Sequence, residues 1–129
     1  MVKKSNLKNI IFTGELTEEE KLQAYAASDI FIHPSHFEGF GIVVLEAFSQ
    51  EACVLTSNQG GLPWVVDNAG LTFEDYNLED LKNKIQQLLS SKKLRESLAS
   101  KGRKRVEQFT WEKLGNQLEE IYKEVMSRT

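Results

Sequence analysis

The segment from Asp29 to Glu46 constrains the fold more than any other part of the chain, because three kinds of local structure follow one another in it. Ile30–Ile32 is a short apolar run that indicates a buried strand, and Pro34 ends it. A glycine turn follows at Gly39–Gly41, and from Ile42 the apolar spacing becomes helical. This order builds a phosphate site, because free N–H groups and the helix dipole both favour an anion at a helix N-terminus.

Two glutamates flank this turn and helix. Glu38 directly precedes the glycine turn, and its place in a loop favours an exposed carboxylate. Glu46 lies two helical turns further on among apolar neighbours, so its carboxylate needs a partner. A nearby cation is the alternative to a ligand in that role. Carboxylates accept hydrogen bonds from hydroxyl groups, so their presence beside a phosphate site indicates a sugar nucleotide as the ligand.

The rest of the chain alternates between strands and helices. Short apolar runs predict strands at 10–12, 30–32, 53–56 and 71–73, about four in all. Six helical segments are predicted, and they open at Thr17, Ile42, Leu62, Asn77, Lys93 and Thr110. This alternation predicts an α/β fold with a Rossmann-like parallel sheet, as an incomplete doubly wound domain. We expect a single domain over residues 1–129, with an α/β core at 9–76 and a helical tail at 77–129.

Ligands of such sheets bind beyond the carboxyl ends of the strands. Gly14, the 35–41 loop and the 58–61 loop all follow predicted strands, so we expect them to gather at one edge. Gly60 and Gly61 should face the same cleft, although an ordinary strand-to-helix turn explains them nearly as well. His33 is interpreted as structural, and the sequence reveals no partner for His36.

Taken together, these segments resemble the family 4 retaining glycosyltransferases, which have the GT-B fold. The resemblance covers the chain from about residue 9 and rests on four segments in order: Phe12–Gly14, Pro34–Ser35 with the E-x7-E signature Glu38–Glu46, Gly60–Pro63, and Asn68–Leu71 ahead of the helical tail. It implies the C-terminal donor-binding domain of such an enzyme, truncated at its N-terminus. The tail contains a further matching segment, Phe109–Glu112.

The resemblance also implies roles for individual residues. Glu38 would be the catalytic residue, contacting sugar hydroxyls beside the reacting bond, and Glu46 would accept hydrogen bonds from the ribose. The substrate-binding residues that it implies are Gly14, Gly39, Phe40, Gly41, Ile42, Glu46, Gly60 and Gly61. The reaction would move a sugar from a UDP- or GDP-linked donor to an acceptor hydroxyl with retention of configuration. Enzymes of this fold work without a bound divalent cation, so no metal or other cofactor is implied.

The family pattern has parts that this sequence does not match. Nothing in Met1–Lys8 resembles the glycine-arginine motif and the lysine that neutralise the diphosphate. The chain is therefore expected to be inactive alone and to need an N-terminal acceptor domain or a partner chain. Glu51 and Trp64 stand where the family usually has glycine and glutamate. Two alternatives stay open: a non-catalytic interaction module and a subunit of a split glycosyltransferase.

Composition narrows the setting and the partners. The net charge of −3 argues against a nucleic-acid partner, and the apolar runs are too short to span a bilayer. Cys53 is the only cysteine, which fits a reducing, cytoplasmic location. The basic residues of 92–105 indicate a solvated helix face, with peripheral membrane contact of the full enzyme as the alternative. An open sheet edge would allow homo-oligomers.

Overall fold

A parallel sheet forms the centre of the molecule, as the alternation of strands and helices predicts. The computed structural model describes residues 7–128, so residues 1–6 and 129 of the expected domain lie outside the described part. The sheet contains β1 (Phe31–His33), β2 (Val54–Ser57) and β3 (Leu71–Phe73), with β2 paired to both neighbours. Because all three strands run in the same direction, their carboxyl ends lie along one edge.

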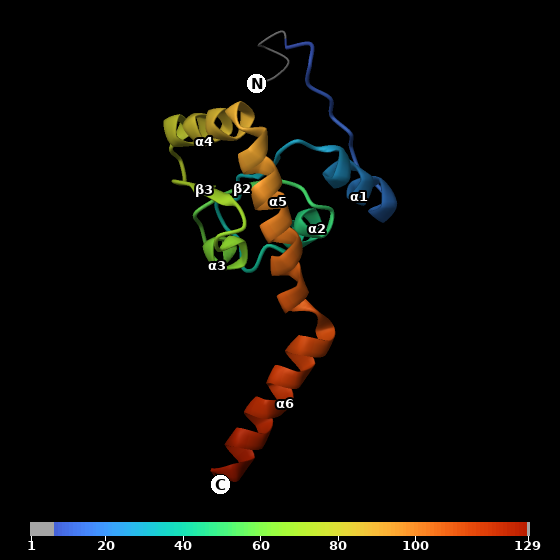
Figure 1. The fold of residues 1–129 in the computed structure, drawn as a ribbon, viewed down its shortest axis with the longest axis vertical. Helices are drawn as coiled ribbons and strands as arrows, with labels where there is room; N and C mark the ends of the chain where they lie inside the picture. Colours follow the sequence, from blue (N-terminus) through green and yellow to red (C-terminus); the bar gives the residue numbers. More distant parts are fainter. Residues whose placement is uncertain (1–6, 129) are drawn as a thin grey trace.

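Helices connect these strands and then continue to the C-terminus. α1 (Glu18–Ala27) precedes the sheet, α2 (Ile42–Ser49) links β1 to β2, and α3 (Leu62–Val66) links β2 to β3. The chain after β3 is helical, as Figure 1 shows, and consists of α4 (Leu78–Ser90), α5 (Lys92–Val106), the 3-10 turn η2 (Glu107–Phe109) and α6 (Trp111–Ser127). All six predicted helical segments are therefore confirmed.

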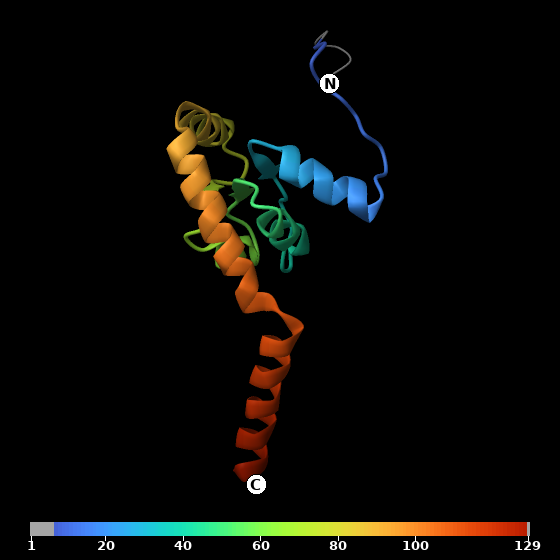
Figure 2. The ribbon, with the colours of Figure 1, turned by 45° about the vertical axis from the view of Figure 1, so that its right-hand side comes forward.

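The predicted strand at 10–12 is wrong. This segment forms no strand, and the side chains of Ile11 and Phe12 are 86% and 75% exposed. It belongs to the extended stretch that leads into α1 in Figures 1 and 2. A short strand is stable only beside a hydrogen-bonded neighbour, and within residues 7–128 neither edge of the sheet pairs with this segment. The described sheet has three strands, where about four were expected.

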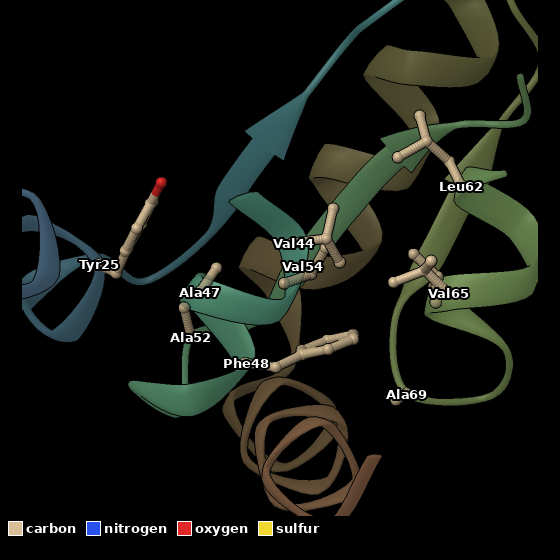
Figure 3. Packing of buried hydrophobic residues seen from close by; sticks show 10 residues of the cluster. Tyr25, Val44, Ala47, Phe48, Ala52, Val54, Leu62, Val65 and Ala69 are labelled. Carbon is tan, nitrogen blue, oxygen red and sulfur yellow. The ribbon is translucent and has the colours of Figure 1, made fainter. Parts of the chain in front are cut away.

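The apolar core lies on both faces of the sheet, because successive strand residues point to opposite sides. Val54 packs with Phe48 of α2 and Val65 of α3 in one cluster, shown in Figure 3. Leu55 packs with Leu88 of α4 in a second cluster. All five side chains are fully buried, and each contributes about 1.5–3 kcal/mol to folding.

A glycine within α5 lets this helix pack closely on α2. A β-carbon at Gly102 would lie 2.3 Å from Cδ1 of Phe48, so no larger residue fits without a shift. Glycine in a helix interior costs about 1 kcal/mol relative to alanine, and this contact explains its presence. Leu94 and Leu98 of α5 face the second cluster, so this basic helix has an apolar side packed on the core.

The last helix is the least integrated part of the chain. Figures 1 and 2 both show α6 extending away from the rest of the molecule, and it contains no buried residue. Its apolar stripe is exposed and consists of Trp111, Leu114, Leu118, Ile121, Tyr122, Val125 and Met126. Thr110 caps the helix as predicted, its side chain accepting a hydrogen bond from Lys113 N at 3.3 Å.

Candidate functional site

Two glycine turns meet at the carboxyl edge of the sheet. The N–H of Gly61 donates to the carbonyl oxygen of Glu38 at 3.2 Å. β-carbons at Gly60 and Gly61 would lie 1.9 and 2.3 Å from the carbonyl oxygens of Glu38 and Gly39. Only glycine permits this approach of one backbone to another. The expected meeting of the two turns is therefore confirmed, and close packing alone already explains Gly60 and Gly61.

Glu38 is held by a histidine from the end of β1. Nε2 of His33 lies 3.0 Å from Oε2 of Glu38, and the two side chains are 23% and 27% exposed. This hydrogen bond holds the pKa of the Glu38 carboxyl below its usual value, and the backbone N–H groups of Phe40 and Gly41 lower it further. Glu38 is thus a fixed, ionised carboxylate. His33 was interpreted as structural, and its partner is the residue that the resemblance implies as catalytic.

The turn after Glu38 leads directly into α2. Gly41 is the N-cap with φ of 91°, a left-handed conformation that glycine adopts without strain, and its carbonyl accepts from Val44 N at 2.9 Å. Gly39 has nothing within 4 Å of its β-carbon position among the described residues. Ile42, the first helical residue, is 66% exposed. The N-terminus of α2 therefore lies at the surface beside Glu38.

Phe40 packs with two other aromatic residues. Its ring centroid is 5.9 Å from that of Trp64 and 5.7 Å from that of Phe109. Arg105 adds its guanidinium 4.9 Å from the Phe109 ring and donates to the carbonyl oxygens of Trp64 and Val65 at 2.6 and 3.1 Å. Phe40 therefore packs within an aromatic cluster of the protein, and the tryptophan that departs from the family pattern belongs to the same cluster.

Glu46 has two partners, both from α1. Nζ of Lys21 lies 3.1 Å from Oε1, and the Tyr25 hydroxyl donates to Oε2 at 3.3 Å. The expectation that this carboxylate needs a partner is confirmed. Lys21 is the nearby cation that the sequence leaves open as the alternative to a ligand. Neither partner was identified from the sequence. The only signal was that Lys21 and Tyr25 are polar groups on the face of α1 that otherwise carries apolar residues.

Gly14 does not follow a strand of the sheet. Its φ is 68°, and within residues 7–128 nothing lies within 4 Å of its β-carbon position. Gly14 was expected at the sheet edge because it follows a predicted strand at 10–12, and that strand is not formed. The structure therefore brings Glu38, Gly39, Gly41, Gly60 and Gly61 together and removes the structural argument for Gly14.

A pair that sequence reasoning missed joins the ends of β1 and β3. Nδ1 of His36 lies 2.5 Å from Oδ1 of Asp75, and its ring stacks on Tyr76 with a centroid distance of 4.2 Å. The backbone N–H of Asp75 donates to Oδ1 of Asn58, in the loop after β2, at 3.1 Å. The loops after all three strands are thus tied together. The sequence contained one signal for this pair: the predicted parallel strands place the loops after β1 and β3 at the same edge of the sheet.

In residues 7–128 no three side chains of histidine, cysteine, aspartate or glutamate gather closely enough to hold a metal ion. Over the same range, every helix is too short or too polar to cross a bilayer.

Comparison with known proteins identifies the family. The family model described as glycosyl transferases group 1 matches residues 1–105, which is most of the chain. The chain belongs to the group 1 glycosyl transferases. Its fold is that of the C-terminal domains of GT-B glycosyltransferases.

Several curated glycosyltransferases are similar to most of the chain. A sulfoquinovosyl transferase from Arabidopsis thaliana is 35% identical over 106 residues, covering 78% of this chain and 21% of the relative. The O-antigen chain mannosyltransferase B of Escherichia coli is 35% identical over 114 residues, covering 88% of this chain and 30% of the relative. The chain therefore spans only a fifth to a third of the length of these relatives.

Solved structures agree with this assignment. A sucrose-phosphate synthase from Thermosynechococcus elongatus matches 99% of this chain and 33% of its own, with a TM-score of 0.85 at 30% identity. The C-terminal domain of a group 1 glycosyl transferase from Francisella tularensis matches 83% of this chain and 57% of its own, with a TM-score of 0.71 at 32% identity.

Proposed function

We propose that this chain is the donor-binding part of a retaining glycosyltransferase, which moves a sugar from a nucleoside diphosphate sugar to an acceptor hydroxyl. The observation that carries the proposal is the arrangement of Glu38. Its carboxylate is ionised, it is held 3.0 Å from His33, and it lies at the N-terminus of the helix that carries Glu46. Sugar, diphosphate and ribose would then lie in this order along the start of α2.

Each part of this site has a chemical role in the proposal. A fixed carboxylate stabilises the positive charge that develops at the anomeric carbon in the transition state. Glu38 can accept hydrogen bonds from sugar hydroxyls while keeping His33, because an ionised carboxylate has about four acceptor positions. The N-terminus of α2 favours the negative charge of the leaving diphosphate. The relatives whose names describe sugar transfer support this reading.

Other parts of the reaction are assigned outside this chain. We place the acceptor site and the cations that neutralise the diphosphate on an N-terminal domain or a partner chain. The isolated chain should therefore bind the donor weakly and transfer little or no sugar. Whether the base is uracil or guanine is an outcome of the experiment below.

The test is a titration of this chain with UDP, GDP, UDP-glucose and GDP-mannose, followed by NMR chemical shifts and by thermal melting. We expect saturable shifts in residues 38–46 with one of the two bases, weakened by Glu38→Gln for the sugar conjugate and by Glu46→Gln for all ligands. Glu112→Gln, on the exposed first turn of α6, is the matched control. A folded chain that shows no shifts at millimolar ligand would contradict the proposal.

A non-catalytic interaction module is the second candidate, and the exposed apolar stripe of α6 favours it. Such a stripe is typical of a surface that binds another protein. This candidate predicts that none of the four ligands binds. It also predicts either that light scattering shows self-association of the chain or that the chain needs a partner protein to remain soluble. Donor binding by the monomer would exclude it.

A further inference from the structure

We propose that Tyr25 and Lys21 of α1 are positioning residues for Glu46, and that they orient its carboxylate toward the two vicinal hydroxyls of the donor ribose. The inference rests on the proposed function, because it concerns the same ligand. The inference adds α1 to the site, although α1 belongs neither to the sequence motif nor to the sheet edge. It assigns selectivity for ribose to this helix.

The two α1 side chains contact different oxygens of the carboxylate. Lys21 Nζ lies 3.1 Å from Oε1, and the Tyr25 hydroxyl lies 3.3 Å from Oε2. Each carboxylate oxygen has about two acceptor positions, so one position on each oxygen remains. Two adjacent hydroxyl groups supply two O–H donors, which is the number that a carboxylate held in this way can still accept.

Both side chains have a second contact besides Glu46. The Tyr25 side chain is only 9% exposed, and its ring packs edge-to-face on Phe31 of β1 with a centroid distance of 5.0 Å. Lys21 also pairs with Glu18 at 2.9 Å. Tyr25 is the only buried residue of α1, so the helix is attached to the body at the point where it meets Glu46. The orientation of the carboxylate thus depends on how α1 is docked.

The charges also suit the role. Lys21 offsets the negative charge of the Glu46 carboxylate. Burial, and next the neighbouring charge of Glu46, raises the pKa of the Tyr25 hydroxyl, so it remains a proton donor at neutral pH. The Tyr25 hydroxyl and the Lys21 ammonium group therefore both act as hydrogen-bond donors to the Glu46 carboxylate.

The test compares UDP and GDP with their 2′,3′-dideoxy counterparts, which lack both hydroxyls, using calorimetry or NMR titration. The variants are Tyr25→Phe and Lys21→Met. Gln23→Met is the matched control, since Gln23 lies on the same helix and bonds Glu19 instead. We expect the unmodified chain to prefer the ribose form. Each variant should reduce this preference about three- to tenfold while leaving affinity for the dideoxy form unchanged, and Gln23→Met should change neither.

The other results overturn the inference in distinguishable ways. Folded variants with an unchanged preference for ribose would show that α1 does not position Glu46. A purely structural role would lower the melting temperature and weaken both ligand forms equally, and that result also overturns it. If the unmodified chain binds both forms with equal affinity, Glu46 does not contact the ribose, although the donor site stands. If it binds neither form, the proposed function fails and the inference fails with it.

Discussion

Replacing Glu51 with glycine should stabilise the fold, because the backbone at this position suits glycine. Glu51 follows the C-cap of α2 with φ of 58°. Its N–H donates to Phe48 O at 3.0 Å, and that of Ala52 donates to Ala47 O at 3.1 Å. These two bonds form a Schellman motif, in which the left-handed position is usually glycine.

The size of the effect follows from two opposing contributions. A residue with a β-carbon costs about 1–2 kcal/mol in the left-handed region. Glycine is more flexible in the unfolded chain, which returns about 0.5–1 kcal/mol. Glu51→Gly should therefore raise the free energy of unfolding by about 1 kcal/mol, which for a chain of this length corresponds to a rise of about 3–5 °C in Tm.

Urea denaturation followed by tryptophan fluorescence measures this change. Glu51→Ala is the control, because alanine removes the charged side chain and keeps the β-carbon. If alanine stabilises as much as glycine, the carboxylate and not the backbone was responsible, and the argument from φ is wrong. If neither variant differs from the original chain, the helix end has rearranged and the motif carries no strain.

Two further predictions follow from the packing and the site. Gly102→Ala should lower the free energy of unfolding by about 1–3 kcal/mol, because the added methyl group overpacks the contact with Phe48. Gly115→Ala is the control and should be neutral or stabilising, because the β-carbon position of Gly115 in α6 has no neighbour within 4 Å among the described residues. Denaturation curves of both variants test this. Glu38 should titrate below the ordinary glutamate pKa, and His33→Gln should move the midpoint back up. Because the pKa of Glu38 is lower in the folded chain than in the unfolded chain, its ionised carboxylate contributes to the free energy of unfolding. This contribution is fully present above the ordinary glutamate pKa and is lost as the pH falls through the lowered pKa. Carboxyl carbon NMR gives both midpoints.

Local signals in the sequence predicted local structure well. The capping box of Thr17 and Glu20, with hydrogen bonds of 3.2 and 2.8 Å, lies within one helical turn, and the sequence shows both residues. The glycine turn before α2 was predicted for the same reason. Residues 10–12 have similar composition to β1 but form no strand, because a strand depends on a neighbour that the local sequence does not contain.

The partners within the site were harder to predict, because they come from distant parts of the chain. Glu46 was expected to need a partner, yet nothing in its own helix identified Lys21, which lies 25 positions earlier. His36 and Asp75 are 39 positions apart and meet only because their strands belong to one sheet. Gly102 shows the same limit, since the reason for a glycine there is a side chain on another helix.

The contact between the two glycine turns has a consequence for engineering the proposed donor site. With carbonyl oxygens 1.9 and 2.3 Å from the β-carbon positions of Gly60 and Gly61, any side chain added there displaces the backbone at Glu38 or Gly39. A mutant library that randomised these glycines would therefore lose the carboxylate geometry in most of its members. Ile42 is exposed at the entrance to α2, so it is the position where diversity can be introduced without moving Glu38.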